Sequence, residues 1–219
     1  MSRAEPYLSI RSLRCVRGPR VLINDLSVEV AAGHGLIITG PNGAGKSTLI
    51  RTIAGWFRPD RGEVSLIGGD DEKTIAEQCH VIGHLNAVKM QLSVEENLAF
   101  IERYFGAALP GAAALERFGL GAIRRVPAAY LSAGQKRRLA LARLVMVERP
   151  LWLLDEPAVS LDAAGQDLLI ALIREHLEGG GIVVAATHTP LDFAPAAELR
   201  LGRPVPVPTR GAPAGAGEP

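Results

Sequence analysis

The segment between residues 40 and 47 constrains the fold more than any other part of this sequence. It reads Gly40, Pro41, Asn42, Gly43, Ala44, Gly45, Lys46 and Ser47, which fits the pattern G-x-x-x-x-G-K-[ST]. An apolar run at residues 35–39 precedes it, and a helical pattern over residues 46–54 follows it. The glycines let backbone N–H groups curl around phosphate oxygens at a helix N-terminus. We therefore predict a nucleotide-binding loop rather than a glycine-rich turn that happens to contain a lysine.

Two side chains at the end of this loop carry the predicted chemistry. The Lys46 ammonium is expected to reach the β- and γ-phosphates of the nucleotide, and the Ser47 hydroxyl is expected to bind Mg²⁺. Thr48 follows directly and belongs to the predicted nucleotide site. The loop therefore predicts a site for a nucleotide together with Mg²⁺.

The rest of the chain alternates between short runs rich in β-branched residues and longer helical patterns. Apolar runs at residues 35–39, 151–154 and 182–186 are typical of strands buried in a parallel sheet. Residues 8–13 and 26–30 alternate with period two, which favours an antiparallel edge. We therefore predict an α/β fold with a largely parallel sheet.

Composition excludes several classes of protein. The 24 Lys and Arg residues against 23 Asp and Glu leave a net charge of +1, so nothing in the global charge attracts nucleic acid. Cys15 and Cys79 are too few for a disulfide framework. No stretch approaches the ~18 consecutive apolar residues of a membrane span, and the first residues lack the apolar core of a signal peptide. If the protein works at a membrane, a partner must hold it there.

A pair of carboxylates follows a predicted buried strand. The apolar run at residues 151–154 ends in Asp155 and Glu156. An acid at the C-terminal end of a parallel strand, beside a phosphate loop, is placed to hold Mg²⁺, so Asp155 joins Ser47 as a predicted metal ligand. Glu156 is then expected to orient or deprotonate a water that attacks the γ-phosphate. Without the phosphate loop, such a pair is also typical of an ordinary helix N-cap.

A capping-box pattern precedes the most basic helix of the chain. The segment Ser132, Ala133, Gly134 and Gln135 is followed by three basic residues. Positive charge in a first turn opposes the helix dipole, which indicates a helix end that faces an anion. Ser and Gly at a free helix N-terminus would suit a γ-phosphate.

The order of these motifs resembles that of an ATP-binding-cassette (ABC) ATPase. The resemblance covers about residues 8–200 and rests on the phosphate loop, Leu-Ser-Ala-Gly-Gln at 131–135, Leu-Leu-Asp-Glu-Pro at 153–157, Ser-Leu-Asp at 160–162 and Thr-His at 187–188. It implies a P-loop NTPase domain with a RecA-like core, an antiparallel β edge and a small helical subdomain. We expect this domain at residues 1–202, its subdomain at about 85–145, and a disordered Pro/Gly/Ala-rich tail at 203–219.

The same resemblance implies a mechanism. In this family two cassettes pair head to tail, so a second copy of the chain is an expected partner. The signature segment (residues 132–135) would contact ATP bound to the opposite cassette. Glu156 would be the catalytic base, His188 would contact the γ-phosphate, and Asp162 would lie in a loop that communicates between the two sites. The implied reaction is Mg²⁺-dependent hydrolysis of ATP.

Three positions depart from the family pattern. Ala133 stands where glycine is usual in the signature. Arg17 stands where an aromatic residue commonly stacks on adenine, and its planar guanidinium can also stack on a base. His84 occupies the loop that normally offers a glutamine to Mg²⁺ and water; an ordinary loop histidine remains an alternative. A zinc site of Cys79, His80 and His84 would lack a fourth ligand at a suitable spacing.

Two longer segments, at residues 83–98 and 134–157, resemble the ATP-binding subunit of the bacterial cytochrome c maturation system, often called the haem exporter. This implies a peripheral subunit on the cytoplasmic side of the inner membrane that powers integral-membrane subunits in haem export or in release of a haem-loaded periplasmic chaperone. Residues 85–130 would contact that partner. No direct haem binding is expected, because there is no C-x-x-C-H motif and no His or Met in an evident apolar pocket.

Three alternatives remain open from the sequence. The chain could be the ATPase subunit of another small single-cassette ABC exporter. A soluble cassette protein that acts on ribosomes or DNA would usually carry two cassettes, or long coiled-coil or basic insertions, and this chain has neither. The third alternative is a nucleotide-binding module without hydrolysis. Lys46, Asp155, Glu156 and His188 argue against it.

Overall fold

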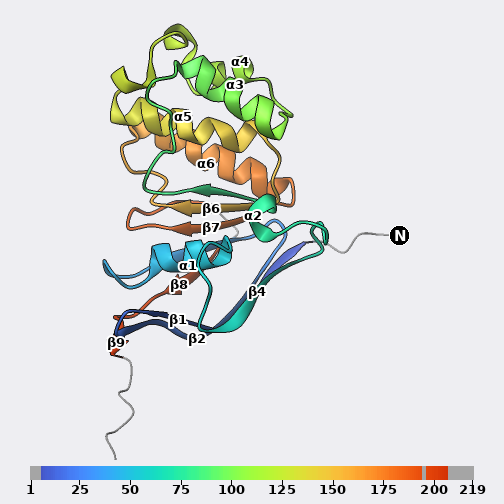
Figure 1. Ribbon diagram of the computed structural model, residues 1–219, viewed down its shortest axis with the longest axis vertical. Coiled ribbons are helices and arrows are strands. Elements are labelled where there is room, and N and C mark those ends of the chain that lie inside the picture. The colour runs from blue at the N-terminus through green and yellow to red at the C-terminus, as the bar shows by residue number, and fades with distance from the viewer. Residues whose placement is uncertain (1–5, 194–195, 207–219) are drawn as a thin grey trace, which may run out of the picture.

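The computed structural model describes residues 6–193 and 196–206. A parallel sheet lies between a group of helices on one side and helix α1 with an antiparallel sheet on the other (Figure 1). The parallel sheet has the order β5 (Cys79–Ile82), β6 (Leu151–Asp155), β7 (Ile182–Ala186), β3 (Gly35–Thr39) and β8 (Ala196–Arg200). The antiparallel sheet has the order β4 (Arg61–Ile67), β1 (Tyr7–Arg17), β2 (Arg20–Ala31) and β9 (Val205–Pro206).

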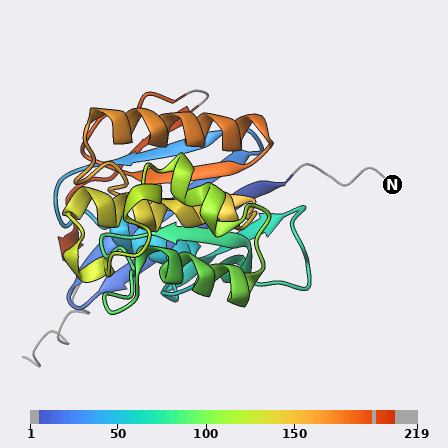
Figure 2. The same ribbon diagram turned by 90° about the horizontal axis from the view of Figure 1, so that it is seen from above.

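The helices differ in length and in their position relative to the sheets. They are α1 (Lys46–Ile53), α2 (Ile75–Gln78), α3 (Val94–Phe105), α4 (Gly111–Arg117), α5 (Ala133–Met146) and α6 (Ala163–Glu178), with two 3₁₀ turns at Gly121–Ile123 and Ala128–Tyr130. Seen from above, α5 and α6 lie next to one another over the parallel sheet, and α3 and α4 lie beside α5 (Figure 2). Within the described residues, no helix combines the length and the apolar character that a membrane crossing requires.

Both faces of the parallel sheet are buried at its central strands β6 and β7, as their continuous apolar runs predict. In β6, Leu151 and Leu153 belong to the core shared with α1 and the antiparallel sheet, whereas Trp152 and Leu154 belong to the core under the helical group. Successive side chains of a strand point to opposite faces, so one apolar run supplies both cores. Each fully buried Leu of this kind contributes about 1.5–3 kcal/mol from burial.

Capping boxes open α3 and α5, and the one at α5 confirms the pattern predicted at Ser132. At the start of α3, the Ser93 hydroxyl accepts a hydrogen bond from the Glu96 amide, and the Glu96 carboxylate accepts one from the Ser93 amide. Ser132 and Gln135 make the same reciprocal pair at the start of α5. These local bonds satisfy orphan amides at the helix ends, which is why the pattern is legible in sequence.

Several elements were not predicted. Strand β8 pairs with the edge of β3, and helix α2 is a single short turn. Strand β9 lies within the segment expected to be a disordered tail, and it pairs with Arg20 and Val21 of β2. The rest of that segment, residues 207–219, lies outside the described residues. The domain and subdomain boundaries remain predictions.

Candidate active site

The phosphate loop joins β3 to α1 through a backbone that only glycine adopts easily. Its φ angles are 140° at Gly40, 77° at Gly43 and 104° at Gly45. A Cβ atom at Gly40 would lie 2.5 Å from the Leu201 carbonyl oxygen, so this position has no room for a side chain. Gly45 is the N-cap of α1, and no side chain caps that end. The first amides of α1 are thus left for an anion.

Lys46 lies folded back over this loop. Its ammonium donates hydrogen bonds to the carbonyl oxygens of Gly40 at 2.8 Å and Pro41 at 3.3 Å, and to Nε2 of His188 at 2.8 Å. An ammonium has no acceptor, so Nε2 of His188 is the acceptor in this contact. Among the described residues, no carboxylate lies within ion-pair distance of Lys46, which is 7% exposed. A phosphate would supply the missing counter-charge.

The acidic end of β6 faces the same loop. Asp155 is buried, and Glu156 follows it with a backbone φ of 51°. The left-handed region costs a non-glycine residue about 1–2 kcal/mol, so other contacts must hold it there. One such contact is the hydrogen bond from the Glu156 amide to the Ala186 carbonyl oxygen at 2.8 Å. The Glu156 carboxylate in turn accepts a hydrogen bond from the His188 amide at 3.3 Å.

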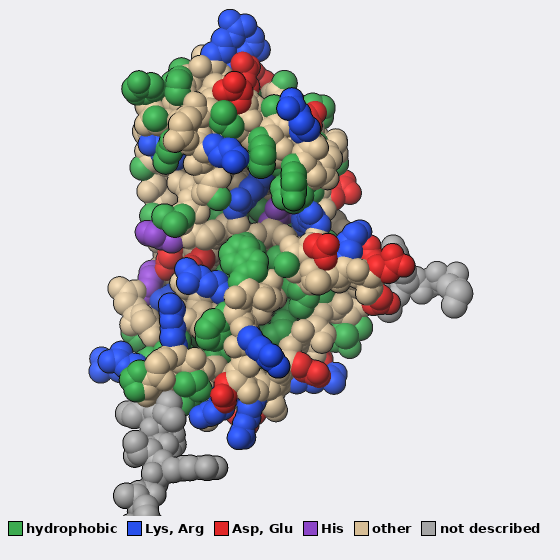
Figure 3. All heavy atoms as spheres, viewed as in Figure 1, with side chains coloured by type: hydrophobic (Ala, Val, Ile, Leu, Met, Phe, Trp, Pro, Cys, Tyr) green, Lys and Arg blue, Asp and Glu red, His purple; other side chains and the backbone are tan. Residues whose placement is uncertain are grey.

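These groups line one open cavity of about 670 Å³. Of the residues predicted to bind nucleotide, metal or water, its lining contains Arg17, Asn42, Gly43, Gly45, Lys46, Ser47, Thr48, His84, Asp155, Glu156 and His188. Gly40 and Pro41 border it through the Lys46 contacts, and Ala44 is buried in the core beneath the loop. In Figure 3, histidine, acidic and basic side chains gather at the left edge of the molecule at about half its height.

The cavity also contains residues that the sequence analysis missed. Arg20 pairs with Arg17 across the turn between β1 and β2, and Leu22 packs its Cβ 3.1 Å from the position of a Cβ at Gly45. Val159 and Thr189 complete the lining. Arg17 and Arg20 flank a Gly-Pro turn, and this spacing is the sequence signal that would have identified Arg20.

The signature segment lies away from this cavity on the same chain. Gly134 packs closely against the backbone of Ser160, since a Cβ at Gly134 would lie 2.8 Å from the Ser160 carbonyl oxygen. Asp162 caps α6 by accepting a hydrogen bond from the Gly165 amide at 3.0 Å. Arg138 of α5 lies 4.0 Å from the Asp162 carboxylate. The signature end of α5 and the Asp162 loop therefore form one packed surface, separate from the phosphate loop.

The oxygen donors in the cavity fit Mg²⁺. Ser47 and Asp155 both line it, and Mg²⁺ favours hydroxyl, carboxylate and phosphate oxygens. The zinc alternative fits less well. Burial raises the pKa of Cys79 to about 11, and Nε2 of His80 bonds the Val147 carbonyl oxygen at 2.7 Å. In the part of the chain that the structure describes, no group of three or more His, Cys, Asp or Glu side chains is arranged to hold a metal ion.

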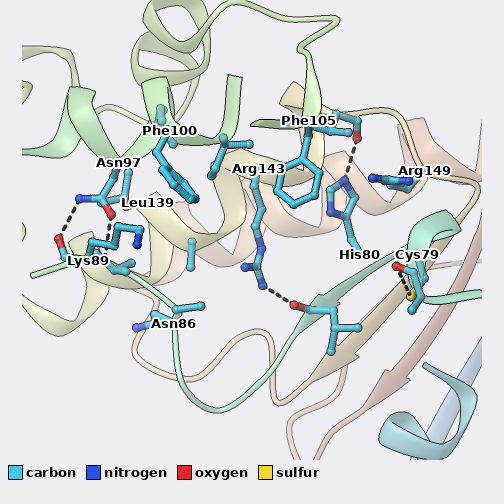
Figure 4. A pocket seen from close by; sticks show the side chains of 18 of the residues that line it. Cys79, His80, Asn86, Lys89, Asn97, Phe100, Phe105, Leu139, Arg143 and Arg149 are labelled. Atoms are coloured by element: carbon cyan, nitrogen blue, oxygen red, sulfur yellow. Dashed lines mark hydrogen bonds between the residues drawn. The ribbon is translucent and has the colours of Figure 1, made fainter. Parts of the chain in front are cut away.

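A second cavity, the helical groove, lies between α3, α5 and the loop after β5 (Figure 4). It measures about 280 Å³, and its aromatic walls are Trp56, Phe100 and Phe105, each about half exposed or more. The Lys89 ammonium lies 4.5 Å from the Phe100 ring centroid, and the Arg149 guanidinium lies 5.8 Å from that of Phe105. These cations lie over aromatic faces, so the groove mouth is both apolar and positively charged.

The sequence predicts no histidine in an apolar pocket, and the helical groove shows that this prediction is wrong. His80 is a buried histidine in a largely apolar cavity, and the sequence analysis had found none. Burial lowers its pKa to about 4, so the ring is neutral. The nearby Arg143 bonds the Val81 carbonyl oxygen, and burial lowers its pKa to about 10. Within the segment expected to contact the partner, residues 86–89 of the loop after β5 line the groove, whereas residues 90–92 do not.

The fold and the nucleotide cavity are those of an ATP-binding cassette. The family described as "ABC transporter" matches residues 23–159. Among solved structures, an ABC transporter ATP-binding protein from Pyrococcus furiosus superposes with a TM-score of 0.75 at 25% identity and covers 89% of this chain and 97% of its own. An ATP-binding subunit of another ABC transporter gives a TM-score of 0.72 at 26% identity and covers 83% of this chain and 79% of its own.

Among curated proteins, two relatives carry the name "Cytochrome c biogenesis ATP-binding export protein CcmA". The protein from Nitrobacter winogradskyi is 52% identical and that from Rhodopseudomonas palustris strain BisB18 is 54% identical, each over 196 residues that cover 89% of this chain and 98% of the relative. The chain therefore belongs to the ABC transporter family and, within it, to the CcmA proteins of cytochrome c biogenesis.

Proposed function

We propose that this chain is the ATP-hydrolysing subunit of a membrane complex for cytochrome c maturation. The observation that carries the proposal is the cavity in which Lys46, Asp155, Glu156 and His188 converge, in a chain 52% identical to a CcmA protein. The charges and donors of that cavity match Mg²⁺ and the phosphates of ATP. The haem-related role comes from the relatives' name.

Nucleotide binding would begin at the phosphate loop. The amides of Gly43 and Gly45 and the start of α1 would surround the β-phosphate. The Lys46 ammonium would exchange its hydrogen bonds to Gly40, Pro41 and His188 for phosphate oxygens, a stronger charge-assisted contact. Arg17 would stack on the adenine ring through its guanidinium plane.

Hydrolysis would then use the acidic end of β6. The water oxygen attacks the γ-phosphorus while Glu156 accepts a proton from that water, and the bond from phosphorus to the bridging oxygen breaks to release ADP. Mg²⁺ held by Ser47 and Asp155 would neutralise charge on the β- and γ-phosphate oxygens. His188, which lies beside both Lys46 and Glu156, would contact the γ-phosphate.

A second copy of the chain would complete each site. The signature segment is remote from the phosphate loop of its own chain, and its first residues, Ser132 and Ala133, are exposed at the start of α5. This helix end would therefore face a nucleotide on another copy. In a head-to-tail pair, Ser132 and Gly134, with Ala133 and Gln135 beside them, would contact the opposite γ-phosphate. Asp162 packs against this helix through Arg138 and would report the state of one site to the other.

The membrane partner would dock on the helical groove. The exposed aromatic rings and the neighbouring cations form an apolar, positively charged binding surface, which suits a segment of an integral-membrane subunit. His84 lines the nucleotide cavity, and residues 86–89 of the same loop line the groove. We expect this loop to couple docking to hydrolysis, so His84→Ala should lower partner-stimulated hydrolysis more than basal hydrolysis. Equal losses would contradict this role.

In the cell, the complex would lie in the inner membrane, with this chain peripheral on the cytoplasmic side. Hydrolysis would drive haem export or release of the haem-loaded periplasmic chaperone. Haem contacts would belong to the partners, because the ring nitrogen Nε2 of His80, in the groove, is already bonded to Val147.

The experiment that tests this proposal measures covalent haem in c-type cytochromes. A strain lacking this chain is complemented with the wild type or with Glu156→Gln. We expect rescue by the wild type only, because the amide cannot accept the proton from water. Normal cytochromes in a deletion strain without a second copy of the gene would contradict the cytochrome role and leave the ATPase assignment standing.

A further inference from the structure

Arg137 is a buried arginine near the start of α5, two residues after the signature segment. It is 3% exposed, which is rare for a guanidinium. Burial lowers its pKa, and the charges of Asp155 and Glu156 oppose that shift. A cation near the start of a helix also opposes the helix dipole. Two unfavourable terms therefore act on this side chain, and specific contacts must offset them.

The contacts of Arg137 converge on the residue proposed as the base. Nε donates to the Pro157 carbonyl oxygen at 3.0 Å, and Nη2 donates to those of Glu156 at 2.7 Å and Asp155 at 3.3 Å. Three consecutive backbone carbonyls thus accept from one planar group. Because the guanidinium is planar and rigid, it fixes the orientation of the backbone at residues 155–157 as well as the distance of that backbone from α5.

The remaining nitrogen of Arg137 reaches a different segment. Nη1 donates to the Gly83 carbonyl oxygen at 2.7 Å and to Oδ1 of Asn86 at 3.0 Å. This segment carries His84, which lines the nucleotide cavity, and Asn86 itself lines the helical groove. One side chain therefore ties the signature helix, the base-bearing loop and the loop between the two cavities.

The backbone of Glu156 is the part that needs such support. Its φ of 51° lies in the left-handed region, which a glutamate does not adopt unless its surroundings hold it. The Glu156 amide donates a hydrogen bond to the Ala186 carbonyl oxygen, which fixes this side of the residue to β7. On the carbonyl side, the partner is Arg137. Together the two bonds set where the carboxylate points.

We propose that Arg137 is a positioning residue that holds Glu156 in its hydrolytic orientation and links it to the loop at residues 83–86. This inference rests on the proposed role of Glu156. Without the guanidinium, the loop at 155–157 relaxes out of the left-handed conformation, and the carboxylate leaves the attacking water. Nucleotide binding, which uses the phosphate loop, is retained.

The test compares Arg137→Gln, Arg137→Lys and the wild type in the full chain. We measure kcat for ATP hydrolysis and the Kd for ATP, after checking by thermal denaturation that each variant is folded. Arg137→Gln should lower kcat at least about tenfold, since small displacements of a catalytic group cost that much, and change Kd less than twofold. Arg137→Lys keeps the charge but lacks the fork, so kcat should be intermediate.

Arg143→Gln is the matched control. Arg143 is also a buried guanidinium of α5, but its hydrogen bond goes to Val81 in β5, away from Glu156. We expect its kcat to stay within about threefold of the wild type. An equal loss of kcat in both variants would overturn the proposal in favour of a general packing role, and so would a parallel loss of ATP affinity in Arg137→Gln.

Hydrogen exchange gives a readout that does not depend on activity. Arg137→Gln should speed amide exchange in peptides covering residues 155–161 and 83–89, whereas Arg143→Gln should speed it around residues 79–82. Unchanged exchange at 155–161 would overturn the proposal. Glu156→Gln separates the two hypotheses: if it hydrolyses ATP normally, the base assignment fails; if it is inactive while Arg137→Gln keeps full kcat, only the positioning role fails.

Discussion

The nucleotide cavity and the helical groove share one loop but are built in different ways. The cavity, about 670 Å³, is lined chiefly by short motifs whose residue types fit phosphate and metal. The groove, about 280 Å³, is lined by aromatic, aliphatic and cationic side chains from α3, α5, β5 and the loop after β5. The residues predicted to bind phosphate thus come from short sequence motifs, whereas the groove proposed for docking forms only where separate elements meet.

The largest effect is expected at Glu156, the proposed catalytic base in the nucleotide cavity. Glu156→Gln should lower ATP hydrolysis by about 10²–10⁴-fold, because general-base catalysis contributes that much, while ATP binding stays within twofold. Single-turnover hydrolysis and fluorescent-nucleotide binding measure the two effects. Glu63→Gln, an exposed site on β4, is the control and should match the wild type. Substantial hydrolysis by Glu156→Gln would move the base elsewhere.

A buried histidine on the groove side should make the fold sensitive to acid. Burial lowers the pKa of His80 from 6.5 in the unfolded chain to about 4 in the folded protein. Between these values the imidazole is protonated in the unfolded chain but not in the folded protein. The free energy of unfolding therefore drops as the pH falls from 6.5 to 4. At pH 4 the loss approaches about 3 kcal/mol for this group. Urea unfolding from pH 7 to pH 4 measures it.

His80→Gln should flatten that pH dependence by about one proton while keeping a donor for the Val147 carbonyl. His176, whose pKa burial also lowers to about 4, remains in the variant as an internal reference. A pH slope identical to that of the wild type would show that His80 does not titrate in this range on unfolding.

Charge at the groove mouth should separate docking from hydrolysis. Phe105→Glu places a carboxylate at an exposed aromatic position and should weaken binding of the membrane partner about 30-fold, equivalent to about 2 kcal/mol for an aromatic anchor. Basal hydrolysis should stay within about twofold. Ile67→Glu on β4 changes an equally apolar exposed site outside the groove and should leave assembly intact. Co-purification in detergent measures both variants.

The smallest effect concerns the adenine contact. Arg17→Ala should weaken ATP binding about two- to fivefold, the amount expected from a planar cation contact at an exposed site. Arg17→Tyr should retain affinity by stacking. Arg11→Ala is the control, because Arg11 lies on the same strand and pairs with Glu29 at 3.9 Å, outside the cavity. Isothermal titration with a non-hydrolysable ATP analogue measures all three, and equal affinities would remove Arg17 from the site.

The sequence predicted much of the fold because its strongest signals are local. A capping box, such as the one at Ser93, is satisfied by bonds three residues apart, and a buried parallel strand such as β6 is a continuous apolar run. Strand β8 escaped notice because it is mostly exposed and gains its place only by pairing with β3. The two-residue strand β9 has no signal of its own for the same reason.

The candidate site divides along the same line. The phosphate-loop pattern, the acidic end of β6 and the capping box of the signature helix are all legible in the sequence, because glycines, carboxylates and caps act over a few residues. The hydrogen bonds from Arg137 to the carbonyl oxygens of Glu156 and Gly83 arise from the packing of α5 against two loops that are distant in the sequence. In the basic run at residues 136–138 the sequence does not distinguish a buried arginine from an exposed one. The burial of Arg137 and the left-handed backbone of Glu156 are both set by the elements that pack around them.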